Sequence, residues 1–210
     1  MKTIKLLALL AIFVGFNSCS NDDDDDPTLL QIESESVVNF YAPQSADYST
    51  NPPTYNGAFT KFDFSTGLAT TSETEWDIAF RGTSIVVNGG MSFGATDEPS
   101  RNGNAAAYFA TGTLASVDSV NTTLLEQDSV NGYVLSNWYD YNPVNHIITP
   151  TAGKIIVVKT RDGKYAKIEI LSYYKDAPAP SEITVDIATN DSRYFTFNYV
   201  YQPNEGVTTF

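Results

Sequence analysis

Short stretches in which apolar and polar residues alternate recur along most of the chain. Residues 192–203, "SRYFTFNYVYQP", show the pattern most clearly, because every second residue is a large aromatic. One face of this segment carries Phe195, Phe197, Tyr199 and Tyr201. Residues 32–42, 74–82 and 105–114 have a similar period of two, which is typical of half-buried β-strands.

Two pairs of neighbouring stretches predict β-hairpins. Residues 154–174, "KIIVVKTRDGKYAKIEILSYY", contain two apolar strands joined by a turn in which Asp162-Gly163 allows a positive φ. Residues 74–90 contain a second pair of strands, with Gly82 between them and Gly89 and Gly90 at the end of the second strand. Residues 58–67, "AFTKFDFSTG", suit one strand with a bulge.

Polar and glycine-rich segments separate these strands. Residues 43–57 are polar and Pro-rich, and residues 91–104 predict an exposed loop. Residues 116–131 are compatible with either a helical turn or a loop. Because no segment keeps a helical period over three turns, the chain predicts an all-β, mostly antiparallel domain at residues 32–210, with two packed sheets and minor helical or irregular loops.

The first residues have the order of an export signal. Lys2 and Lys5 precede an apolar run at residues 6–16 that is too short to span a bilayer. Ser18 and Cys19 follow, and this layout resembles a bacterial lipoprotein signal in which residues 1–18 are removed and the Cys19 thiol is acylated. The alternatives are a plain signal peptide with an incidental cysteine, or a buried thiol.

An acidic tether follows the predicted lipidation site. Asp22 to Asp26 repel one another and stay solvated, so residues 19–31 would hold the domain away from the membrane. An acidic run after the acylated cysteine is also similar to the surface-export signal of Bacteroidetes lipoproteins. This similarity implies an outer-membrane protein exposed at the cell surface, and a simple spacer is the alternative.

The charge of the chain limits its partners. The formal charge is −13, and it falls to −15 once the two lysines of residues 1–18 are lost. Such a chain repels nucleic acid and anionic lipid head groups, so contact with a membrane would come through the lipid anchor. Cys19 is the single cysteine, which excludes a disulfide within the chain.

The sequence does not predict an enzyme. His146 is the single histidine and Cys19 is assigned to lipid, so a Ser-His-Asp or Cys-His site lacks parts. Motifs for zinc or for nucleotide phosphates are also missing. Asp97-Glu98 is a candidate glycosidase pair, but its glycine-rich loop favours solvated charges instead.

Two short strings suggest modification. "DSV" occurs at residues 118–120 and again at 128–130, and it is similar to the O-glycosylation site of exported Bacteroidetes proteins. Ser119 and Ser129 are therefore candidate O-glycosylation sites, although three-residue motifs also recur by chance.

Four segments together resemble the family of HmuY-like haem-binding lipoproteins. They are "FTKFDFSTG" (59–67), "WDIAFRGTSIVVNGG" (76–90), "KIIVVKTRDGKYAKIEILSYY" (154–174) and "RYFTFNYVYQP" (193–203). The resemblance implies a two-sheet β fold and export through a lipoprotein signal. It also implies haem capture between two loops on behalf of an outer-membrane TonB-dependent receptor.

The resemblance implies two axial iron ligands, two histidines in one branch of the family and two methionines in another. This sequence departs from both, because the mature chain offers one of each, His146 and Met91. A mixed pair is chemically reasonable. Tyr139 and Tyr141 are candidates for a phenolate ligand or for stacking on a porphyrin, whereas Trp138 suits the core better.

The leading hypothesis is thus a lipid-anchored, surface-exposed protein that binds haem, or a related hydrophobic ligand, and passes it to a receptor. The second is a non-haem interaction lipoprotein that partners an outer-membrane transporter or binds glycan. A hydrolase on a β-scaffold is a remote third. The sequence leaves open the axial ligand pair, the loops that form the pocket and whether the chain forms a homo-oligomer.

Overall fold

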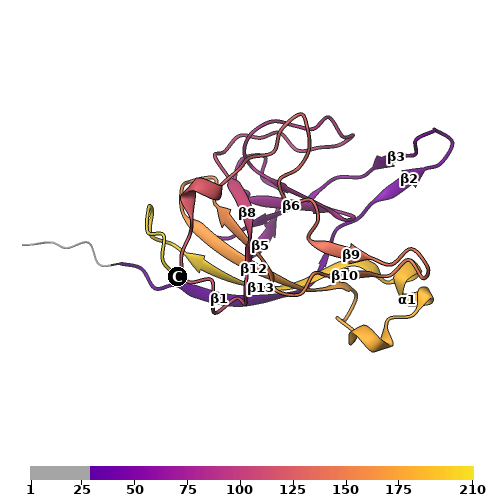
Figure 1. The fold of residues 1–210 in the computed structure, drawn as a ribbon. Helices are drawn as coiled ribbons and strands as arrows, with labels where there is room; N and C mark the ends of the chain where they lie inside the picture. The colour runs from indigo at the N-terminus through magenta and orange to yellow at the C-terminus, as the bar shows by residue number, and fades with distance from the viewer. Residues whose placement is uncertain (1–28) are drawn as a thin grey trace, which may run out of the picture.

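The computed structural model describes residues 29–210, which form two packed antiparallel sheets and two small hairpins (Figure 1). The larger sheet has the order β1-β13-β12-β11-β8 and consists of β1 (Glu33–Tyr41), β8 (Ala106–Thr111), β11 (Lys154–Lys159), β12 (Tyr165–Tyr174) and β13 (Ser192–Gln202). The smaller sheet has the order β5-β4-β6-β7 and consists of β4 (Thr60–Asp63), β5 (Leu68–Thr70), β6 (Ile78–Arg81) and β7 (Ser84–Val87).

The remaining elements are short. One hairpin pairs β2 (Ser45–Asp47) with β3 (Thr54–Asn56), and the other pairs β9 (Tyr139–Tyr141) with β10 (Ile148–Pro150). The helical elements are two 3₁₀ turns, Thr122–Leu124 and Pro180–Glu182, and α1 (Val185–Asn190). Thr184 caps α1 by accepting a hydrogen bond from the backbone N–H of Ile187.

Aromatic side chains fill the space between the two sheets. The four aromatic residues on one face of β13, Phe195, Phe197, Tyr199 and Tyr201, are all buried, as the alternation predicts. Phe62 of β4 meets Phe197 edge to face at a centroid distance of 5.5 Å. Edge-to-face contacts of this kind stabilise a core beyond the area that they bury.

The predicted all-β class with two packed sheets is confirmed. Every range that was expected to form a strand contains at least one strand of the two sheets. These ranges are residues 32–42, 58–67, 74–90, 105–114, 154–174 and 192–203. Residues 43–57, expected only to separate two strands, form the β2–β3 hairpin instead. Their side chains are mostly exposed, so no alternation of buried and solvated residues marked them.

The turn between β11 and β12 ties one sheet to the other. The Arg161 guanidinium of this turn pairs with Asp63 at 2.9 Å and with Asp77 at 3.2 Å, both of which belong to the smaller-sheet region. The backbone N–H of Arg161 also donates to Asp77 Oδ1 at 2.9 Å. The pattern predicted the turn but gave no indication of this junction.

One charge expected to be solvated is buried. The side chain of Glu98 is 2% exposed and pairs with Arg101, whose guanidinium also contacts Asp128 at 3.0 Å. The expectation for Glu98 was therefore wrong, although Asp97 is exposed. Glu98 also accepts hydrogen bonds from backbone N–H groups of residues 93–95, so it organises the β7–β8 loop rather than a catalytic site.

Replacing Gly163 by valine should lower the free energy of unfolding by about 1–2 kcal/mol. Gly163 has φ +90°, a region that a β-branched residue enters only with strain. A Cβ there would lie 3.8 Å from Glu205, so backbone strain rather than a clash is the cause. Urea unfolding measures the loss, and Gly163→Asn is the matched control because asparagine tolerates positive φ. Equal stability of Gly163→Val and wild type would contradict the expected strain.

Several predictions concern residues 1–28, which lie outside the described part of the chain. These are the signal segment, Cys19 as the lipidation site and the acidic run Asp22 to Asp26. Among residues 29–210, no helix is long and apolar enough to cross a membrane.

Candidate functional site

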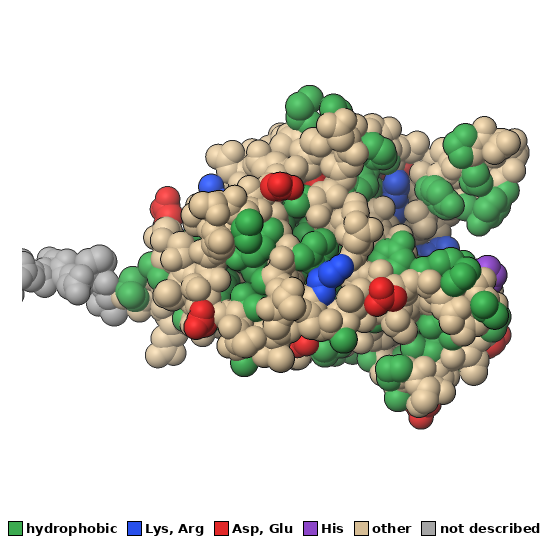
Figure 2. Space-filling view, viewed as in Figure 1, with side chains coloured by type: hydrophobic (Ala, Val, Ile, Leu, Met, Phe, Trp, Pro, Cys, Tyr) green, Lys and Arg blue, Asp and Glu red, His purple; other side chains and the backbone are tan. Residues whose placement is uncertain are grey.

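Two hairpin arms project from the same end of the molecule. The β2–β3 arm extends well beyond the two sheets, and the β9–β10 arm lies against β12 at the same end of the molecule, with its tip turned outward (Figure 1). Figure 2 shows open space between two projecting parts of the surface at this end, with hydrophobic side chains on both parts and basic side chains at the bottom of the space. We call this space the inter-arm gap.

The tip of the β9–β10 arm is a tightly hydrogen-bonded turn. Asn142 accepts a bond from the backbone N–H of His146 at 2.8 Å, and its own N–H donates to Ile147 at 2.9 Å. His146 is exposed and has φ +59°. A non-glycine residue at positive φ is uncommon and costs free energy, so the turn holds the imidazole in an orientation that a relaxed chain would seldom adopt.

The structure brings two predicted site residues together. The Tyr141 hydroxyl forms a hydrogen bond with Nδ1 of His146, and the two ring centroids are 5.9 Å apart. When Nδ1–H donates to the phenol oxygen, Nε2 carries the free lone pair. A histidine that binds a metal through one nitrogen commonly has its other nitrogen fixed by such a partner. Tyr141 therefore acts as the residue that orients His146.

The base of this arm is fixed in the core. Trp138, directly before β9, is 2% exposed, and its indole N–H donates to the Thr83 carbonyl at 2.8 Å. Tyr139 is half-buried and packs against Trp138 at a centroid distance of 4.9 Å. Trp138 is thus a core residue, as expected, and Tyr139 supports the arm instead of facing solvent.

A basic residue links the bases of the two arms. Arg193, at the start of β13, donates from its guanidinium to the carbonyl of Gln44, the residue before β2. Arg193 also lies close to Tyr173, where burial raises the pKa of the phenol and the Arg193 charge opposes that rise. Tyr173 in turn packs against Trp138 at 5.7 Å. The guanidinium therefore joins the start of β13 to the base of the β2–β3 arm, beside the Tyr173 phenol.

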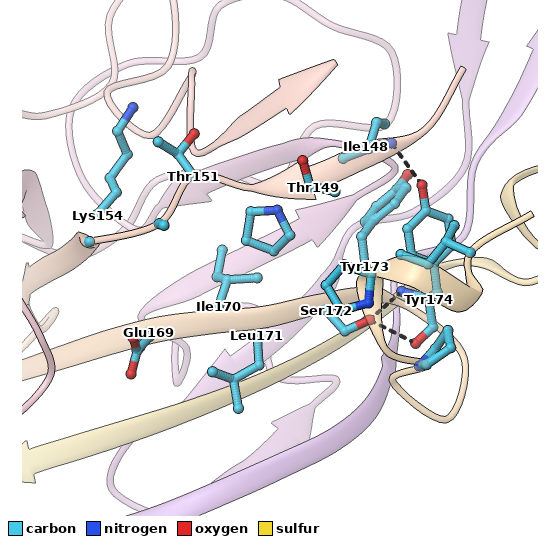
Figure 3. Close-up of a pocket in the computed structure, with 16 residues that line it drawn as sticks. Ile148, Thr149, Thr151, Lys154, Glu169, Ile170, Leu171, Ser172, Tyr173 and Tyr174 are labelled. Atoms are coloured by element: carbon cyan, nitrogen blue, oxygen red, sulfur yellow. Dashed lines mark hydrogen bonds between the residues drawn. The ribbon is translucent and has the colours of Figure 1, made fainter. Parts of the chain in front are cut away.

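A smaller cleft lies behind the β9–β10 arm, between β10, β12 and residues 178–183 (Figure 3). Its volume is about 190 Å³, less than the several hundred cubic ångströms of a typical cofactor site. The Tyr174 hydroxyl accepts a hydrogen bond from the Ile148 N–H at 2.7 Å, which joins β10 to β12 (Figure 3). This cleft is too small for a porphyrin, and its hydrogen bond steadies the arm.

The other proposed ligand lies on a different loop. Met91 is exposed on the β7–β8 loop, and its N–H donates to the Asp128 carbonyl at 2.9 Å. The structure does not join it to the His146–Tyr141 pair. In the described part of the chain, no group of three or more His, Cys, Asp or Glu residues is arranged to hold a metal ion.

The two candidate glycosylation serines differ in accessibility. Ser119 is exposed and its hydroxyl donates to Asp118 at 3.0 Å. Ser129 is half-buried in a turn closed by its own N–H and the Gly132 carbonyl, and its neighbour Asp128 is buried. Both remain predictions, and Ser119 is the more accessible of the two.

Sequence reasoning missed the β2–β3 arm and Arg193 as parts of this site. The arm carries two exposed aromatic side chains, Tyr48 and Tyr55, in an otherwise polar segment. Exposed aromatics among polar residues are a signal for binding, but only the fold places this hairpin at the same end of the molecule as the β9–β10 arm.

The residues around the inter-arm gap fit a haem group. A free imidazole nitrogen suits iron, tyrosine rings on both arms offer apolar faces for a flat macrocycle, and the Arg193 guanidinium at the base of the β2–β3 arm suits a carboxylate.

Several solved structures are similar to this chain. A structure of an apo HmuY analogue from Tannerella forsythia has a TM-score of 0.51 and 16% identity, over 84% of this chain and 100% of that one. A putative HmuY-like heme-binding protein from Bacteroides vulgatus has a TM-score of 0.47 and 15% identity, over 82% and 93%. A putative lipoprotein from Bacteroides fragilis has a TM-score of 0.48 and 14% identity, over 82% and 90%.

At these identities a structural likeness speaks for the fold alone, and no curated protein matches the sequence. The sequence model of the HmuY protein family matches residues 55–199, which is more than half of the chain. The matched range contains the nine strands from β4 to β12 in full. This chain therefore belongs to the HmuY family.

Proposed function

We propose that this chain is a lipid-anchored protein of the outer membrane that binds haem and passes it to a TonB-dependent receptor. Family membership supports a binding protein rather than an enzyme. The main support for haem as the ligand is His146, which is exposed at the tip of an arm beside an open gap and is oriented by a hydrogen bond to Tyr141.

Each part of the site has a separate role in this proposal. His146 binds iron through Nε2, while Tyr141 fixes the tautomer and the orientation of the imidazole. Aromatic side chains on the arms cover the macrocycle, and Arg193 attracts its carboxylates. Haem supplies the iron centre that such a side chain recognises. The open gap leaves the ligand accessible, as delivery to a second protein requires.

A titration with haemin tests the proposal. The chain from residue 20 onward omits the signal segment and Cys19, and it should bind one haemin with a sharp shift of the Soret band. Serum albumin and a denatured sample of the same chain control for nonspecific adsorption. A featureless spectrum without a saturation point would refute haem binding and would favour the interaction lipoprotein.

Replacing Cys19 by serine should abolish membrane anchoring, because serine offers no thiol for acylation. Palmitate labelling and fractionation measure the effect, and Ser20→Ala is the control at the neighbouring position. Labelling that persists in Cys19→Ser would show that the lipidation site was misassigned.

Replacing Asp22 to Asp26 by alanine tests surface exposure separately. The variant should stay lipidated, but protease added to intact cells should no longer cleave it.

A further inference from the structure

We infer that a pocket between the β6–β7 turn and the start of the β9–β10 arm binds one neutral sugar ring. Its volume is about 170 Å³, and its lining comes from two segments, residues 83–85 and 133–139. We call it the edge pocket, because β7 is an edge strand of the smaller sheet. This inference goes beyond the proposed function and does not depend on haem binding.

One hydrogen bond holds the two sides of the edge pocket together. The indole N–H of the buried Trp138 donates to the carbonyl of Thr83 at 2.8 Å. Ile85 and Leu135 line the pocket from the core side, since both side chains are buried. The pocket is therefore preformed and has an apolar base, as ligand sites usually have.

The edge of β7 contributes backbone groups to this pocket. A two-residue turn pairs Arg81 with Ser84, and backbone N–H and C=O groups alternate in direction along a strand, so those of Ile85 point away from β6. The N–H of Val87, two residues further along, supports this direction because it donates to Asp128 at 3.0 Å instead of to β6. Ile85 therefore directs one donor and one acceptor toward the edge where the pocket lies.

Three polar side chains of the edge pocket have no hydrogen-bond partner among residues 29–210. They are the half-buried hydroxyls of Thr83 and Ser84 and the side-chain amide of Asn137. The hydrogen bonds of this region use backbone oxygens instead, namely the Thr83 carbonyl for Trp138 and the Asn137 carbonyl for Lys154. Hydroxyl and amide groups both donate and accept hydrogen bonds, as the hydroxyls of a sugar require.

Asn137 has an uncommon backbone conformation. Its φ is +64°, a region that asparagine enters more readily than most residues but still at a cost in free energy. Trp138 follows it directly and is fixed in the core, so the surrounding structure maintains this conformation. Such strained positions concentrate at sites that hold a ligand, which supports a binding role for the Asn137 amide.

The lining favours a neutral ring over a charged ligand. None of the eight residues that line the edge pocket is charged, so an ionised group would lose hydration there without compensation. Tyr139 is half-buried in the lining, and its aromatic ring suits the apolar C–H face of a sugar. A volume of about 170 Å³ is below the roughly 300 Å³ at which typical cofactor sites begin, so the pocket suits a single sugar ring and not a porphyrin.

Saturation-transfer difference NMR with single sugars tests this inference. The chain from residue 20 onward is mixed with glucose, galactose, mannose or N-acetylglucosamine at about 10 mM, because a small uncharged site binds weakly. We expect saturation transfer to at least one of these sugars and a weaker signal from glucuronate, which adds a carboxylate to the same ring. Asn137→Gly should weaken binding by about 3–10-fold, because it removes the amide while glycine accepts the positive φ. Asn131→Gly is the matched control, since it removes an exposed amide outside the lining.

Three results would overturn the inference. Absence of transfer to all four neutral sugars excludes a sugar site, and equal affinities of wild type and Asn137→Gly place the sugar elsewhere on the chain. Glucuronate that binds as tightly as the best neutral sugar excludes the neutral class. Ser84→Ala removes a second free hydroxyl without a change of backbone, so it replaces Asn137→Gly if thermal unfolding shows that the glycine variant does not fold.

A trisaccharide of the bound sugar identifies the source of the ring. Transfer confined to its terminal ring indicates the end of a glycan, whereas binding of the single sugar alone indicates a free sugar. The haemin titration is a separate measurement on the same chain, so sugar binding and the proposed function can fail independently.

Discussion

Replacing Arg161 by methionine should lower the free energy of unfolding by about 3–5 kcal/mol. Methionine fills a similar volume but leaves Asp77, which is 1% exposed, without its charged partner. Asp63, which is 5% exposed, loses a contact of 2.9 Å at the same time. An uncompensated buried charge is costly because the low-dielectric interior does not replace the solvation that water gave.

Chemical denaturation followed by tryptophan fluorescence measures this loss. Lys164→Met is the matched control, since Lys164 lies in the same turn and pairs at 2.9 Å with Asp162, where both side chains are partly exposed. A surface pair of that kind contributes less than about 1 kcal/mol. Equal losses in the two variants would mean that Arg161 does not hold the sheets together through buried carboxylates.

The effect of Arg161→Met should also depend on pH. Burial raises the pKa of Asp77 in the wild-type protein, and the hydrogen bonds from backbone N–H groups and the Arg161 charge oppose that rise. Removing the positive charge raises the pKa further, so the folded variant holds the proton more tightly than the unfolded chain does. The variant should therefore recover stability as the pH falls from neutral toward about 4, the usual range of an aspartate.

The strands of the two sheets were predictable because burial leaves a pattern in the sequence. In β13, every second side chain meets the core, so the aromatic alternation marked both the strand and its inner face. Gly163 marked the β11–β12 turn for a similar local reason. Arg161, in contrast, is charged and lies in a turn, and its buried partners Asp63 and Asp77 lie almost a hundred residues earlier. Such long-range pairing has no local signature.

The site shows the same division between local and long-range information. His146 was a candidate because the mature chain has a single histidine, and Tyr141 because a phenol can ligate iron or stack on a porphyrin. Their hydrogen bond depends on the short turn between β9 and β10, in which Asn142 and His146 close the backbone. The β2–β3 arm and Arg193 come from segments about 150 residues apart, and only the fold shows that they meet.

Replacing His146 by alanine should have the largest effect on ligand binding. His146 is the single imidazole of the chain, and its turn already holds it at φ +59° with Nδ1 occupied by Tyr141. Removing a residue that orients a metal ligand weakens metal binding about 10–100-fold, so removal of the ligand itself should cost at least as much. If haem binds as proposed, loss of the imidazole should also change the absorption spectrum of the complex.

Haemin titrations of His146→Ala and Tyr141→Phe separate the two roles. Tyr141→Phe keeps the imidazole and removes only the hydroxyl that orients it, so the spectrum should stay close to that of wild type while the affinity falls. Thermal unfolding of both variants controls for folding, since both side chains are exposed and neither should contribute to the core. If His146→Ala binds haemin with the wild-type affinity and spectrum, iron is held elsewhere, and the tip of the β9–β10 arm has a purpose other than ligation.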